Sequence, residues 1–171
     1  MVATFQSQVN LDQTTGIPGE YAKAGPQREF PGIIKSTNAA ANIFSRAFSH
    51  VAASDDNVIA GGTGAFAGLL MNPKEHSAIG TALGTLEPQI SIPSESNASF
   101  AQMGIIYVTF NTTASIGQNV EYDTSTGANA GRIQAVTGNT ASGGHAIIPG
   151  ARVTTRNLTT TGQVGIVQLT A

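Results

Sequence analysis

The chain contains no cysteine among its 171 residues. This excludes a disulfide framework, a thiolate metal site and a cysteine nucleophile together. The longest apolar run, residues 64–71, is much too short to cross a bilayer. The first residues also lack the cationic stretch followed by an apolar run that marks a secretory signal. We therefore expect a protein that is synthesised in the cytoplasm of its producer and has no membrane partner.

Charge is the second scarce property. Only 11% of the residues are Asp, Glu, Lys or Arg, against roughly a quarter in an average soluble domain. A monomer usually needs charge on its surface to stay soluble, so this deficit predicts a homo-oligomer, a trimer or dimer. The net charges of residues 1–50, 51–131 and 132–171 are +1, −6 and +3. Three late arginines do not form the basic stripe of a nucleic-acid-binding protein, so we expect no nucleic-acid partner.

The first 36 residues differ in pattern from the rest. Their apolar residues are scattered between Gly and Pro, and neither a strand nor a helix period continues through them. We interpret residues 1–36 as an extended N-terminal arm that is ordered by the surface on which it lies. Hydrophobic residues make up 40% of the chain, which is enough to build a core. Residues 37–171 are therefore predicted to form a single β-barrel or sandwich domain.

Strand signals dominate this second part. Residues 104–110 alternate between two faces and predict a central strand. Residues 116–122 and 131–136 are expected to pair, and further strands are predicted at 151–155 and 163–169. Residues 43–51 fit either a helix or a strand, and we favour a strand. Short strands separated by Gly, Asn and Ser turns indicate a mainly β fold, a small β-barrel or jelly-roll-like body.

Two patterns raise the question of chemistry. Residues 62–67 (GTGAFA) match a relaxed dinucleotide-binding motif, yet no repeated strand–helix units follow and Pro73 stops any helix early. A glycine turn is the better interpretation. The three histidines are far apart in sequence, without the spacing of a metal or catalytic site. We predict no enzyme activity, no catalytic or metal-binding residues and no cofactor.

Several segments together resemble one protein family. They are residues 3–10 (ATFQSQVN), 61–76 (GGTGAFAGLLMNPKEH), 103–108 (MGIIYV), 116–123 (IGQNVEYD), 148–152 (IPGAR) and 162–167 (GQVGIV). The sequence is similar in these segments, and nearly over its whole length, to the structural cement (capsid decoration) proteins of tailed bacteriophages.

This resemblance implies a β-rich subunit on the outer surface of the virion. It would bind the lattice of the major capsid protein, bridge neighbouring capsomers and stabilise the head. The arm is the expected bridge, since an extended segment can add to a neighbour's sheet edge. The anchors that we predict at the capsid or subunit interface are Phe5, Val9, Tyr21, Arg28 and Phe30. Aromatic anchors can equally pack against the protein's own barrel.

Three other classes of protein remain open at this point. An extracellular adhesin or receptor-binding β module fits the Thr- and Gly-rich strands. A phage tail or baseplate component fits the same composition. A nucleotide-binding enzyme fits only the glycine motif, and a ligand-binding screen would test it.

Overall fold

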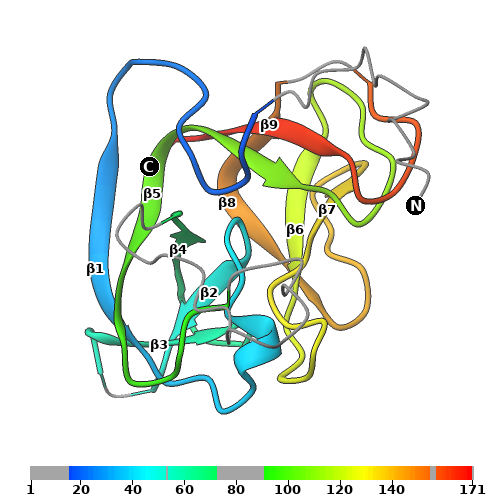
Figure 1. Ribbon diagram of the computed structural model, residues 1–171. Helices are drawn as coiled ribbons and strands as arrows, with labels where there is room; N and C mark the ends of the chain where they lie inside the picture. The colour runs from blue at the N-terminus through cyan, green and yellow to red at the C-terminus, as the bar shows by residue number, and fades with distance from the viewer. Residues whose placement is uncertain (1–15, 53, 73–90, 155–156, 171) are drawn as a thin grey trace, which may run out of the picture.

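The computed structural model describes residues 16–52, 54–72, 91–154 and 157–170. These residues form nine strands and one short 3-10 helix (Figure 1). The elements are β1 (Arg28–Ile34), η1 (Ala39–Ala41), β2 (Ala47–His50), β3 (Asn57–Ala60), β4 (Phe66–Leu70), β5 (Asn97–Thr109), β6 (Asn119–Asp123), β7 (Ile133–Val136), β8 (His145–Val153) and β9 (Val164–Leu169). The mainly β, barrel-like fold predicted from the sequence is thus confirmed.

The strands form two rings that share β5. In the first ring the order is β1–β3–β2–β4–β5, and β1 closes it by pairing antiparallel with β5. The pairing of β1 with β3 is parallel, and the other pairings of this ring are antiparallel. We call this ring the first lobe. Phe48 and Phe100 meet at its centre with ring centroids 5.0 Å apart, and Ile34, Val58 and Leu70 are buried with them.

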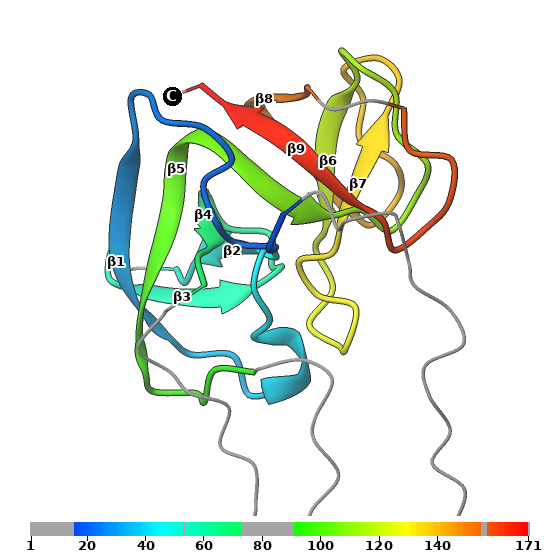
Figure 2. The same ribbon diagram turned by 45° about the horizontal axis from the view of Figure 1, so that its top comes forward.

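The second lobe continues from the other half of β5. Its strands follow the order β5–β9–β8–β6–β7, all antiparallel. A single parallel bridge between Phe110 and Ile133 brings β7 back beside the end of β5. Ile106, Val108 and Phe110 are fully buried in the second core, as the alternation of residues 104–110 predicts. Figure 2 shows β9 running beside the C-terminal half of β5, with which it pairs antiparallel, while β1 runs beside its N-terminal half.

The strand predicted over residues 43–51 is wrong in its first part, because β2 begins only at Ala47. Residues 39–41 form η1, whose N-cap Asn38 accepts a hydrogen bond from the Ala40 N–H with its side chain. Ser45 then adopts a φ of 65°, which an extended strand cannot contain. The helical turn capped by Asn38 and the left-handed conformation of Ser45 therefore prevent a continuous strand from residue 43.

The two lobes are joined by backbone hydrogen bonds as well as by side-chain packing, such as that of Phe66 in β4 against Tyr122 in β6. The Ala47 N–H donates to the Gly131 carbonyl, and the Gly61 N–H donates to the Ala47 carbonyl, both at 2.9 Å. Gly61 and Gly131 have φ values of 66° and 71°. A β-carbon at Gly131 would lie 2.3 Å from the Ala47 carbonyl oxygen. Glycine is required at Gly131 both for its conformation and for this close approach.

Candidate functional site

The structure describes three of the five predicted interface residues. Phe5 and Val9 lie outside the described residues. Tyr21 is half-buried against the second core and forms an antiparallel bridge with Ile106. Phe30 is half-buried against the first core, and Arg28 is exposed at the start of β1. Their role at an interface stays a prediction.

Phe30 makes its aromatic contacts within the first lobe. Its ring lies edge-on to His50, with centroids 5.1 Å apart, and its centroid is 6.4 Å from that of Phe100. Such contacts with buried side chains are typical of a core residue. Only the exposed part of the Phe30 side chain is free to contact another protein.

Residues 19–22 lie along the C-terminal half of β5. The Gly19 N–H donates to the Tyr107 carbonyl at 2.8 Å, and the Ala22 N–H donates to the Ile105 carbonyl at 2.7 Å. In return, the Tyr107 N–H donates to the Glu20 carbonyl at 2.9 Å. This part of the predicted arm therefore occupies a sheet edge of its own subunit. The boundary predicted at residue 36 stays a prediction, but β1 within that range is hydrogen-bonded into the sheet.

Burial also changes the chemistry of Tyr21. It raises the pKa of the Tyr21 hydroxyl to about 12, and the negative charge of Glu29 adds to the effect. The hydroxyl thus stays neutral well above physiological pH. The oxygen atom is itself buried, so it is not accessible to a partner protein at the surface of this subunit.

Residues 23–29 form the most exposed part of the described N-terminal region, and we call them the strap. Each of the seven residues is exposed. Figure 1 shows residues 23–27 of the strap arching away from the sheet before β1, which contains its last two residues, begins. Beneath it lies a pocket of about 220 Å³, lined by Lys23, Pro26, Met103, Ile105 and Leu169 among others. The strap and the exposed Ile17, which has 54% of its surface accessible, form a surface suited to contact with another protein.

The glycine motif has the geometry of a turn. It connects β3 with β4, the two strands that flank β2, so that a strand and not a helix comes directly after the glycines. Gly62 has a φ of 75°, and its N–H donates to the Thr124 carbonyl of the second lobe at 3.1 Å. These glycines therefore form a turn at the junction of the lobes. A dinucleotide-binding site would instead need a strand followed by a helix.

The histidines do not converge in the described part of the chain. His50 lies in β2 and His145 begins β8, whereas His76 lies outside the described residues. The residues that the structure describes contain no group of three or more His, Cys, Asp or Glu side chains arranged to hold a metal. No helix among them is long and apolar enough to cross a membrane.

The structure also brings together two arginines that the sequence does not connect. Arg46, just before β2, and Arg132, just before β7, line one pocket at the junction of the lobes. In the sequence, Arg46 lies within the strand predicted over residues 43–51, and Arg132 is one of the three arginines of residues 132–171. Their proximity depends on the pairing of distant strands, for which neither segment carries a signal.

Comparisons with family models and with solved structures each find a match to this chain. The model of the family described as "Structural cement protein (E217 gp24/Pam3 gp6)" matches residues 5–170. A similar solved structure is a chain from "The capsid of Myoviridae Phage XM1", with a TM-score of 0.65 and 18% sequence identity over 98% of each chain. This likeness shows a shared fold. The search of curated proteins finds no match.

Proposed function

This chain belongs to the phage family of structural cement proteins, and from that premise we propose how it serves the capsid. It binds the outer surface of the assembled lattice of the major capsid protein and bridges neighbouring capsomers. It acts as a homo-oligomer, without enzyme activity and without nucleic acid. The observation that carries the proposal is the family match over nearly the whole chain.

The exposed strap supports a docking role for the N-terminal region. It lies between two anchored segments, since residues 19–22 pair with β5 and β1 pairs with both β3 and β5. Anchoring at both ends reduces the conformational entropy that the strap loses on binding. Arg28 and Glu29 present opposite charges at its end, which suits the orientation of a partner more than raw affinity.

Cementing then follows from mass action. A protein that binds only the expanded shell stabilises that state by its binding free energy, about 1.4 kcal/mol for each tenfold in affinity. Repetition over many equivalent sites and the bridging of capsomers increase the total through avidity. The low charge content of 11% is consistent with a surface that is largely covered in the assembled particle.

The test uses undecorated expanded heads and the purified full-length protein. We expect saturable co-sedimentation, and decorated heads should rupture at a higher temperature than bare ones. The variant Arg28→Glu should bind more weakly because it reverses a charge on the strap. Arg152→Glu is the matched control, since Arg152 is exposed on β8 in the second lobe. Absence of head binding by the wild-type protein at low and moderate salt would overturn the proposal.

A further inference from the structure

The pocket that holds Arg46 and Arg132 lies where the two lobes join. Its volume is about 160 Å³. The turn before β2 contributes Ser45 and Arg46, the end of β5 contributes Thr109 and Asn111, and Arg132 stands at the entry to β7. Its walls therefore come from three segments that are distant in sequence, one from the first lobe and two from the second.

The charges in this pocket are unbalanced. None of the described residues that line it is Asp or Glu. The pKa of Arg46 is lowered to about 10, first by burial and then by the neighbouring charge of Arg132, while the charge of Asp123 opposes these effects. Among the described residues, the side chain of Arg132 has no hydrogen bond or ion pair. The ion pair in this part of the chain joins Lys35 to Glu95, outside the pocket. The pocket thus carries unpaired positive charge.

Its geometry is fixed before any ligand arrives. Nη1 of Arg46 donates to the Ala128 carbonyl at 2.7 Å and to the Ala130 carbonyl at 3.0 Å, which immobilises one side of the guanidinium group. Ser45 is buried with a φ of 65°, and its Oγ accepts a hydrogen bond from the Thr109 N–H at 3.3 Å. A strained residue held in place by its surroundings is a frequent feature of binding sites.

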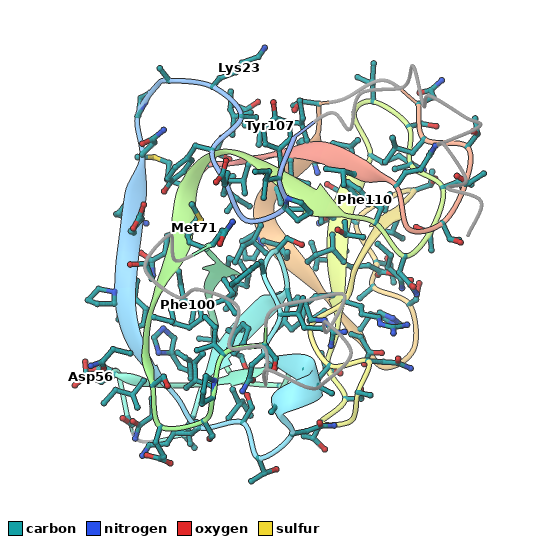
Figure 3. All side chains as sticks on the ribbon, in the orientation of Figure 1. Lys23, Asp56, Met71, Phe100, Tyr107 and Phe110 are labelled. Carbon is teal, nitrogen blue, oxygen red and sulfur yellow. The ribbon has the colours of Figure 1, made fainter. Side chains whose placement is uncertain are left out.

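Two guanidinium groups in a partly buried pocket suit a carboxylate, because its oxygens match the fork of arginine donors. The chain itself carries such groups in an accessible form. Asp55 and Asp56 are adjacent and exposed on the loop between β2 and β3, without an ion pair in the described part of the chain. Figure 3 places Asp56 and Phe110, which lines the pocket, on opposite sides of the molecule. The loop therefore cannot fill the pocket of its own subunit.

We propose that the Arg46–Arg132 pocket receives the Asp55–Asp56 loop of a second copy of this chain. The contact places a carboxylate of one subunit against the guanidinium groups of the next. Because the loop and the pocket lie apart, each subunit offers one of each, and the contact closes either reciprocally about a two-fold axis or from subunit to subunit around a ring. The inference rests on the homo-oligomer that the proposed function includes, and it names the residues that join the subunits.

Charge reversal tests this contact in solution, without heads. By sedimentation velocity, Arg132→Glu and Asp56→Arg should each weaken self-association about tenfold or more, because each sets like charges against one another. The double variant R132E/D56R should recover self-association. An equimolar mixture of the two single variants should associate better than either alone. Wild-type self-association should also weaken as salt is raised.

Arg152→Glu changes the same charge at an exposed site and should associate like the wild type. Arg132→Gln, which removes the charge without reversing it, provides the comparison if Arg132→Glu fails to fold. A double variant that stays dissociated, or single variants that associate normally, would overturn the inference. So would Arg132→Glu losing head binding while its self-association is unchanged, since the carboxylate would then come from the shell. Head binding by the wild type tests the cement function separately, so the two failures are distinguishable.

Discussion

Gly131 joins the two lobes through a backbone contact that leaves no room for a side chain. Its φ is 71°, and an added β-carbon would lie 2.3 Å from the carbonyl oxygen of Ala47. The same backbone accepts the hydrogen bond from the Ala47 N–H. A substitution there has to strain the residue and separate the lobes at once.

We expect Gly131→Ala to lower the free energy of unfolding by roughly 2–5 kcal/mol. The left-handed conformation costs about 1–2 kcal/mol with a β-carbon, and overpacking adds about 1–3 kcal/mol. Urea denaturation measures the change. Gly127→Ala is the control, because a β-carbon at Gly127 meets nothing within 4 Å and its φ is not in the left-handed region. If the two variants were equally stable, the close approach of Gly131 to the Ala47 carbonyl oxygen would be contradicted.

At the scale of elements, the N-terminal segment behaves as an edge strand of its own subunit. Residues 19–22 exchange three backbone hydrogen bonds with β5, and a fourth joins the Asn72 N–H to the Gly19 carbonyl at 2.8 Å. Gly16 packs so closely on the ring of Tyr107 that a β-carbon there would lie 2.4 Å from it. The segment thus covers a strand whose polar groups would otherwise be open on that side.

Two truncations separate this segment from the residues before it. Deletion of residues 1–22 should lower the free energy of unfolding by about 2–6 kcal/mol, since it removes four backbone hydrogen bonds worth about 0.5–1.5 kcal/mol each. Deletion of residues 1–15 retains all four and should leave the stability close to that of the full chain. Thermal and urea unfolding compare the two proteins. Equal losses would show that the hydrogen bonds of residues 19–22 are not the stabilising part.

At the scale of the whole molecule, two hydrophobic cores depend on one strand. Phe100 is buried in the first core and Val108 in the second, and both belong to β5. Neither ring can lose this strand and remain closed. Because the covalent continuity of β5 couples the cores, the lobes should unfold together.

Phe100→Ala and Val108→Ala test this coupling. Phe100→Ala should cost about 3–5 kcal/mol, and Val108→Ala should cost less because it removes fewer buried methyl groups. Each variant should show a single transition in which tyrosine fluorescence and far-ultraviolet circular dichroism coincide. Tyr122 of the second core reports on a lobe that Phe100 does not belong to. Two separate transitions in Phe100→Ala would show that the lobes are independent.

Local patterns in the sequence were sufficient for the fold class and for part of the strand order. The alternation through Ile106, Val108 and Phe110 predicts a buried strand, because successive side chains of a strand point to opposite faces. The pairing of residues 116–122 with 131–136 appears as β6 and β7, since a short connection with turn residues joins antiparallel neighbours. The resemblance to cement proteins likewise came from segments spread over the chain, and the family match confirms it.

Only the tertiary structure decided which distant segments meet. It closed β1 onto β5, divided the interior into two cores, and placed Tyr21 and Phe30 against the protein's own body. It also brought Arg46 beside Arg132, which no spacing in the sequence could indicate. The physical reason is that periodicity reports the neighbours of a residue along its own strand. Ring closure and convergence of side chains depend on pairings between strands that are far apart in the chain.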